Sequence, residues 1–223
     1  MTMKKLMFML LATLALTGCS GAAKENAEVS GGTSSTPKEV IENHEYVDLG
    51  LPSGLKWATC NIGAKKPTDL GDYFAWGETK TKSTYSESTY QHHDGEDYTD
   101  IGIDISGTQY DVARKEWGGT WRMPTKNDFV ELMKNCDWQW TKLNGTDGYM
   151  VVSNTNGNKI FLPFTGYRKD GNSWINLGSE GHYWTASPDS WDSFAQCLLI
   201  KPGYINVTTQ LRYMAFTVRP VSE

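Results

Sequence analysis

Three cysteines, Cys60, Cys136 and Cys197, are the residues best suited to covalent chemistry in the main body of the chain. In an exported protein, thiols meet an oxidising compartment in which disulfides form. We expect a disulfide between Cys60, on an early strand, and Cys136, at a helix end, with three buried thiols as the alternative. Cys197 lies in an apolar run and is expected to be a small buried hydrophobic residue. No two of the three are closely spaced, which argues against a metal site built from them.

Histidines and carboxylates are the next candidates for chemistry. The run His92-His93-Asp94-Gly95-Glu96-Asp97 could ligate zinc or manganese. It is strongly polar without a regular period, which favours a solvated loop, so we expect neither a metal nor a cofactor. Glu78, Asp170 and Glu180 could act as acids or bases, but nothing in the sequence pairs them at a defined separation. The sequence also lacks a serine nucleophile elbow and a phosphate-binding glycine loop, so it favours a protein without catalytic activity.

A polar, turn-rich segment near the middle of the C-terminal half carries unexpected aromatic residues. The candidate ligand-binding residues there are Tyr167, Arg168, Trp174, His182 and Trp184. Binding residues concentrate on loops that a rigid scaffold supports. Aromatic faces and planar polar groups suit a sugar or a peptide segment, because stacking fixes the orientation of a ligand and hydrogen bonds select it. The alternative is that Trp174 and Trp184 only hold a long loop against the core.

The N-terminus carries the signals of an exported, lipid-anchored protein. Lys4 and Lys5 precede an apolar run, Leu6 to Leu16, which is shorter than the about 20 residues that a membrane-spanning helix needs. The run fits the apolar region of a secretory signal peptide. Leu16-Thr17-Gly18-Cys19 follows and resembles the bacterial lipobox, in which the cysteine is acylated and becomes the new N-terminus.

We therefore predict a lipoprotein signal peptide over residues 1–18 and a lipid anchor at Cys19. Two or three acyl chains on one residue hold a protein durably at a membrane, unlike a single chain. The predicted location is the bacterial cell envelope, with the membrane as a partner through the anchor. An ordinary signal peptide followed by a chance cysteine is the alternative.

The composition changes sharply near residue 44. Residues 19–43 consist mainly of Gly, Ala, Ser, Thr, Lys and Glu and contain no aromatic residue. Such a segment cannot bury enough apolar area to offset the entropy of ordering it, so we predict a flexible tether. All nine Trp and all eleven Tyr lie in residues 44–223, which we predict to be one domain with its own core.

Short strands are predicted to make up most of this domain. Alternating or apolar runs predict strands over 55–60, 195–200 and 213–219. Two further strands, 149–153 and 159–162, flank a segment with turn chemistry and are predicted to form a hairpin. Pro202-Gly203 is expected to end the strand before it.

Two helices are predicted. Thr125 and Asp128 form a variant of the capping box. Phe129, Leu132 and Met133 then follow the helical period, so a helix is predicted to begin after Thr125. A shorter helix is predicted over 111–117, ended by the glycines that follow it. Few helices, short mixed or antiparallel strands and long loops predict an α+β domain.

The charge balance excludes one class of partner. The chain has 21 Lys and Arg against 26 Asp and Glu, which gives a net charge of −5. Proteins that bind nucleic acids carry a basic excess that neutralises phosphates. We therefore expect no nucleic-acid partner.

Six ordered segments of the domain resemble a known family. They are 48–64 (DLGLPSGLKWATCNIGA), 71–79 (GDYFAWGET), 117–125 (WGGTWRMPT), 161–163 (FLP), 183–187 (YWTAS) and 216–221 (FTVRPV). In this order they are similar to the Fibrobacter succinogenes major paralogous domain, which is abundant in lipoproteins of Bacteroides-like bacteria. The resemblance covers residues 46–221 and implies a C-type-lectin-like fold, loop-rich with terminal strands that meet, and an outer-membrane location. It implies no established activity.

Two better-known groups share the implied fold. Formylglycine-generating enzymes carry a segment similar to Arg122-Met123-Pro124-Thr125 and an arginine similar to Arg219, but their paired reactive cysteines have no match here. Calcium-dependent lectins bind sugars through short sequence motifs. Trp191-Asp192-Ser193 resembles one of these motifs only in part, so calcium-mediated sugar binding is not predicted. The sequence thus predicts a non-catalytic binding or adhesion module of the cell envelope for a glycan or protein ligand. An oxidative enzyme similar to the formylglycine-generating group and a structural envelope or fimbria-associated subunit are the alternatives.

Overall fold

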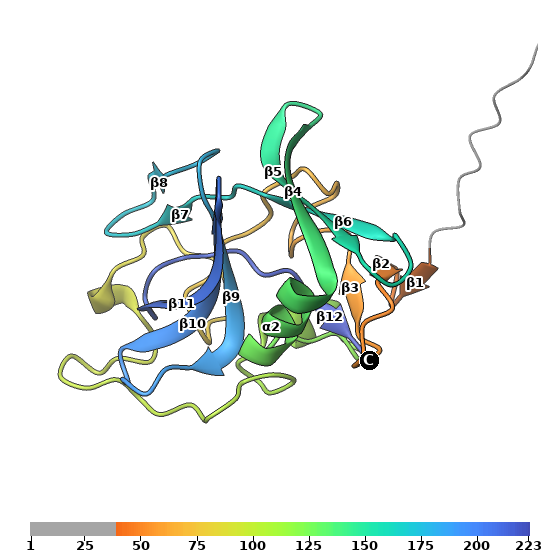
Figure 1. The fold of residues 1–223 in the computed structure, drawn as a ribbon. Helices are drawn as coiled ribbons and strands as arrows, with labels where there is room; N and C mark the ends of the chain where they lie inside the picture. The colour runs from red at the N-terminus through yellow and green to blue at the C-terminus, as the bar shows by residue number, and fades with distance from the viewer. Residues whose placement is uncertain (1–38) are drawn as a thin grey trace, which may run out of the picture. The chain divides into compact units, whose positions relative to one another are not determined.

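The computed structural model describes residues 39–223. The predicted signal peptide, the Cys19 anchor and most of the predicted tether lie outside the described residues. Antiparallel strands in four small sheets dominate residues 39–223, with two α-helices beside them (Figure 1). The prediction of a loop-rich α+β domain is therefore confirmed as a broad fold class.

The first sheet joins the two ends of the domain. Its strands, in spatial order, are β1 (Glu39–Ile41), β2 (His44–Asp48), β3 (Lys56–Ala58) and β12 (Val221–Ser222). β3 lies between β2 and β12 and pairs with both in antiparallel fashion. Figure 1 shows the C-terminus beside these strands.

β1 corrects the predicted end of the tether, which was placed at residue 43. Glu42 and Asn43 both have positive φ angles, 47° and 64°, and form the tight turn that folds β1 back on β2. The Ile41 carbonyl also accepts a hydrogen bond of 2.9 Å from Nε1 of Trp121. The domain therefore begins several residues earlier than its aromatic composition suggests.

A second sheet consists of β9 (Gly181–Pro188), β10 (Phe194–Lys201) and β11 (Tyr204–Leu211), with β10 in the middle. The predicted strand over 195–200 is confirmed as β10, and Pro202-Gly203 forms the turn to β11 as predicted. A positive φ of 73° at Gly203 suits this turn.

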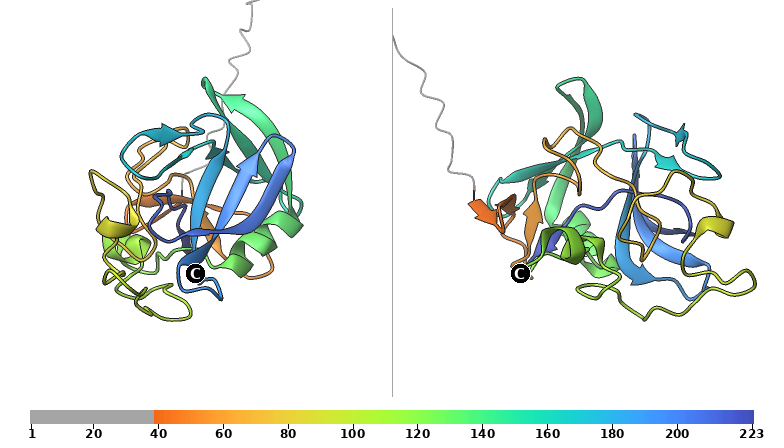
Figure 2. Two further views of the ribbon diagram at one scale, coloured as in Figure 1. Left: turned by 90° about the vertical axis from the view of Figure 1, so that its left-hand side faces the viewer. Right: turned by 180° about the vertical axis from the view of Figure 1, so that it is seen from behind.

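The third sheet contains β4 (Cys136–Leu143), β5 (Thr146–Ser153) and β6 (Lys159–Pro163). The predicted hairpin over 149–162 is confirmed as β5 and β6. β7 (Tyr167–Arg168) and β8 (Trp174–Ile175) form a separate two-stranded sheet. Both views of Figure 2 place the tip of the β4–β5 hairpin and the β7–β8 sheet on the same side of the domain.

The helices form where the sequence predicts them. In α2 (Lys126–Asn135), the Thr125 hydroxyl accepts from the backbone N–H of Asp128, and the Asp128 carboxylate accepts from the N–H of Thr125 at 2.7 Å. α1 (Val112–Trp117) begins after Asp111 and ends at Gly118, and a short 3₁₀ turn, η1, spans Glu87–Thr89. Within residues 39–223, no helix has the length and apolar composition needed to cross a bilayer.

The predicted strand over 213–219 is wrong as a regular strand. This segment forms isolated bridges with three different neighbours, at Phe74, Arg168 and Tyr183, instead of one continuous ladder. Its mainly apolar composition reflects burial, because every residue from Tyr213 to Arg219 is buried. A buried segment that crosses between several loops has the same residue pattern as a strand.

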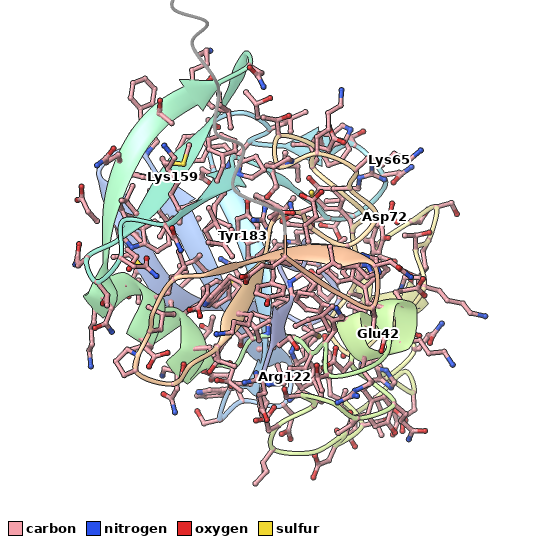
Figure 3. All side chains as sticks on the ribbon, turned by 90° about the vertical axis from the view of Figure 1, so that its right-hand side faces the viewer. Glu42, Lys65, Asp72, Arg122, Lys159 and Tyr183 are labelled. Atoms are coloured by element: carbon pink, nitrogen blue, oxygen red, sulfur yellow. The ribbon has the colours of Figure 1, made fainter. Side chains whose placement is uncertain are left out.

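Buried side chains form two apolar clusters. In the first, the Trp184 ring stacks on Phe216 with 4.2 Å between centroids. In the second, Trp57 contacts Phe129 of α2, with 5.2 Å between centroids. Tyr183 belongs to the second cluster and lies near the middle of the view in Figure 3, with Lys65 and Lys159 toward its edges.

Candidate functional site

An open groove of about 610 Å³ lies where three distant parts of the chain meet. Residues 68–71 form one wall. Gly145 of the β4–β5 turn and the first two residues of β5, Thr146 and Asp147, form the second. Trp174, Leu177 and Gly178 form the third. Phe164, which follows β6 and is buried, also lines the groove.

Backbone hydrogen bonds fix the walls relative to one another. The Phe164 N–H donates to the carbonyl of Asp147 at 2.8 Å, and the Gly178 N–H donates to the carbonyl of Phe164 at 3.1 Å. On the opposite wall, the Leu70 carbonyl accepts from the Asn61 amide at 2.9 Å and from the Thr217 hydroxyl at 3.1 Å. The groove is therefore formed by the fold itself, which reduces the entropy that a ligand must offset.

Trp174 is the aromatic side chain that the groove presents to solvent, with 38% of its surface exposed. The Arg168 guanidinium lies 4.0 Å from its ring centroid, and Tyr73 meets the ring edge-on at 4.5 Å. Arg168 also lies over Tyr73, at 5.2 Å, and donates a hydrogen bond to the side chain of Asn172. Cation–π contacts and the aromatic pair thus hold the indole in one orientation.

The structure brings together Arg168 and Trp174 from the five predicted ligand-binding residues. They are paired across β7 and β8. Tyr167 is adjacent to Arg168 in the strand, so its side chain points to the opposite face. There it contacts His182 at 4.8 Å and Phe216 at 6.0 Å between ring centroids. Tyr167 therefore supports the β7–β8 sheet from the core side.

His182 and Trp184 are corrected to core residues, since 3% and 0% of their surfaces are exposed. Trp184 donates from Nε1 to the carbonyl of Phe74 at 2.8 Å. His182 Nε2 lies 3.2 Å from the Glu180 carboxylate, while its Nδ1 is buried without a hydrogen-bond partner. Burial lowers the pKa of His182 although Glu180 opposes the shift, so the imidazole is held in its neutral form. Neither side chain reaches the groove.

Four polar side chains of the groove escaped the sequence prediction: Thr68, Asp69, Thr146 and Asp147. Asp69 Oδ2 accepts from the backbone N–H groups of Lys65 and Lys66, at 3.2 and 3.0 Å. Asp147 Oδ2 lies 2.8 Å from Lys142 Nζ. Because these residues come from segments far apart in the sequence, no local motif connects them with Trp174.

The predicted disulfide between Cys60 and Cys136 is not formed, and Cys197 is free as well. Cys136 is buried at the junction of α2 and β4 among Phe129 and Leu132. Its apolar surroundings raise the pKa of the Cys136 thiol to about 11. Cys60 is half-buried in the loop after β3, outside that cluster. The three thiols are therefore separate, but the alternative of three buried thiols holds only for Cys136 and Cys197, because Cys60 is half-buried. Cys197 is fully buried as predicted.

The histidine and carboxylate run at 92–97 forms a loop, as its composition indicates. Asp94 accepts from the backbone N–H groups of Glu96 and Asp97, at 2.9 and 2.8 Å, and His92 Nε2 lies 3.1 Å from the carbonyl of Gly77. In the part of the chain that the structure describes, no three His, Cys, Asp or Glu side chains are grouped as a metal would need.

Arg122 and Arg219 both have structural partners. Arg219 is fully buried and donates to Asn61 Oδ1 at 2.8 Å, to the Phe161 carbonyl at 3.0 Å and to the Ala58 carbonyl at 3.2 Å. Arg122 pairs with Asp128 at 2.8 Å. Each arginine thus connects segments of the fold and lies outside the lining of the groove.

Comparison of the chain with models of protein families, with curated proteins and with solved structures finds no match.

Proposed function

We propose that this chain is a lipoprotein of the bacterial cell envelope whose folded domain is a non-catalytic binding module. The preformed groove with the solvent-exposed Trp174 is the observation that carries the proposal. It combines a fixed aromatic face with hydroxyl and carboxylate groups, which is the composition of a small recognition site. The domain presents these groups on loops and strand ends, where binding residues concentrate in many folds.

We propose further that the domain is C-type-lectin-like and related to the Fibrobacter succinogenes major paralogous domain. The meeting of the N-terminal and C-terminal strands in one sheet supports this fold. The six ordered segments of the sequence support the relationship. An outer-membrane location follows from the same resemblance.

The anchor is proposed from the sequence alone, because Cys19 lies outside the described residues. Wild-type protein expressed in a bacterium is expected to incorporate a clickable fatty acid and to fractionate with membranes. The Cys19→Ala variant is expected to lose the label and to leave the membrane fraction, since acyl chains supply the attachment. Labelling of Cys19→Ala equal to that of the wild type would place the lipid elsewhere.

The binding site is tested by comparing two exposed tryptophans. Trp174 lines the groove, whereas Trp191, with 72% of its surface exposed, lies in the loop between β9 and β10. For a ligand found on arrays of glycans and peptides, Trp174→Ala is expected to weaken binding by about tenfold or more, because truncating an aromatic residue at the centre of a binding site costs about 2 kcal/mol or more. Trp191→Ala is expected to keep the wild-type affinity.

Titration calorimetry gives both affinities, and thermal unfolding shows that each variant is folded. An equal loss in the two variants would reject the groove as the site. A wild-type protein that binds nothing on either array would reject the binding function.

A further inference from the structure

Apart from the indole N–H of Trp174, the polar side chains that line the groove are all hydroxyls or carboxylates. They are Thr68, Asp69, Thr146 and Asp147, and the described residues of the lining include no Lys, Arg or His. The lining therefore carries two carboxylates: Asp147 is paired with Lys142, which lies outside the lining, and Asp69 accepts only from backbone N–H groups. It offers oxygen atoms, which are mainly hydrogen-bond acceptors, and hydroxyls that can both donate and accept.

Several of these oxygens have no partner within residues 39–223. The hydroxyls of Thr68 and Thr146 make no hydrogen bond there, and the carboxylates of Asp69 and Asp147 use only their Oδ2 atoms. Each carboxylate thus keeps its Oδ1 atom for a donor from outside the protein. A ligand that complements the groove must bring several O–H or N–H donors close together.

The apolar part of the groove sets a second requirement. Trp174 and Leu177, 38% and 45% exposed, lie on one wall, and the Arg168 guanidinium supports the indole. A pyranose ring has a C–H face that packs on an indole and carries hydroxyl donors around its rim. One such molecule meets both requirements, since stacking orients the ring and the carboxylates accept its hydroxyls.

The two carboxylates also discriminate by charge. An anionic group in the groove would face the charge of Asp69, which no ion pair offsets within residues 39–223, whereas Lys142 partly offsets the charge of Asp147 and Arg168 lies against the Trp174 ring. Like charges brought together at a binding surface lower affinity strongly, and more so as ionic strength falls. Sugars that carry carboxylate or sulfate groups are therefore disfavoured relative to uncharged ones.

We infer that the groove binds a neutral saccharide, through Trp174 stacking and hydrogen bonds to Asp69 and Asp147. The inference rests on the proposed function and adds the class of ligand. Its central element is the use of carboxylates to accept from sugar hydroxyls and to exclude anionic sugars.

Matched pairs of oligosaccharides test the inference. β-1,4-Manno-oligosaccharides differ from β-1,4-mannuronate oligosaccharides only in a hydroxymethyl group in place of a carboxylate at C6, and cello-oligosaccharides differ from β-1,4-glucuronates in the same way. A neutral glycan array extends the panel to other sugars. The full chain is titrated at low and physiological ionic strength, with tryptophan fluorescence and calorimetry as readouts.

The neutral member of at least one pair, or a neutral glycan of the array against its uronate counterpart, is expected to bind about tenfold or more tightly than the anionic one. The double variant Asp69→Asn, Asp147→Asn keeps side-chain acceptors but removes both charges, and is expected to reduce this ratio to below about threefold. Asp137→Asn, an exposed carboxylate of β4 outside the groove, is the matched control and is expected to keep the wild-type ratio.

Equal or tighter binding of the uronates, or a ratio unchanged in the double variant, would overturn the inference. If only a peptide binds and its binding is lost in Trp174→Ala, the inference fails while the proposed binding function stands. If neither a glycan nor a peptide binds in a way that Trp174→Ala weakens, both the inference and the proposed binding function fail.

Discussion

Replacing Arg219 with methionine is expected to lower the free energy of unfolding by about 3 kcal/mol or more. The guanidinium is fully buried and donates to Asn61, Ala58 and Phe161. Methionine fills similar space but leaves these acceptors without a donor, and each unpaired buried group costs about 1–3 kcal/mol. Urea unfolding followed by tryptophan fluorescence measures the change.

An opposing effect is that methionine removes a buried charge, whose desolvation is itself unfavourable. Burial lowers the pKa of Arg219, and this shift reflects the cost of removing its charge from water. The loss of the three hydrogen bonds is nevertheless expected to outweigh the gain from removing the buried charge. Asn61, one of the three acceptors, is also fully buried, and its amide is engaged in a hydrogen bond to the Leu70 carbonyl at the groove wall.

Arg122→Met is the matched control for this substitution. Its guanidinium is partly exposed, with 15% of the side-chain surface accessible, and pairs with Asp128. Water can replace this contact, so a smaller cost of about 1 kcal/mol is expected. An Arg219→Met variant as stable as the wild type would show that the three acceptors find other donors.

Substitution of Asp111 by alanine is expected to cost about 4 kcal/mol, since four backbone donors lose one acceptor group. The buried carboxylate accepts from the N–H groups of Gly107 at 2.6 Å, Ala113 at 2.8 Å, Met123 at 2.9 Å and Arg114 at 3.1 Å. It therefore caps α1 and also joins that helix to the segment before α2.

Thr125→Ala is the comparison for Asp111→Ala. Thr125 caps α2 through one backbone hydrogen bond, from Asp128, so its loss is expected to cost about 1 kcal/mol. Thermal and urea unfolding measure the loss of stability in each variant. A larger loss in Asp111→Ala than in Thr125→Ala is expected, because Asp111 joins two segments in addition to capping a helix. Equal losses would show that the contacts of Asp111 beyond α1 contribute little.

Local signals predicted the helices well. Thr125 and Asp128 specify the start of α2 through their own side chains, and Gly118, with a φ of 71°, ends α1. The β5–β6 hairpin was also predictable, because its turn residues lie between two apolar runs. In each case the residues that decide the structure are close together in the sequence.

The candidate site was predictable only in part, because its residues are joined by tertiary contacts. Trp174 was identified by its polar, turn-rich surroundings, and Arg168 was identified with it. Trp184 and His182 have similar neighbours in the sequence, but they lie on β9, whose position between the core clusters buries them. Asp69 and Asp147 carry no local signal, since each becomes part of the groove only when distant loops meet.

The position of β12 has a consequence for the biogenesis of the protein. Val221 pairs with Trp57 on one side and with Arg122 on the other, so residues more than 160 positions later in the sequence complete the contacts of an early strand. The ladder along β3 stays open on one side until those residues have been synthesised. Since domains fold as units, this domain completes its folding only after Val221 and Ser222 are available for pairing.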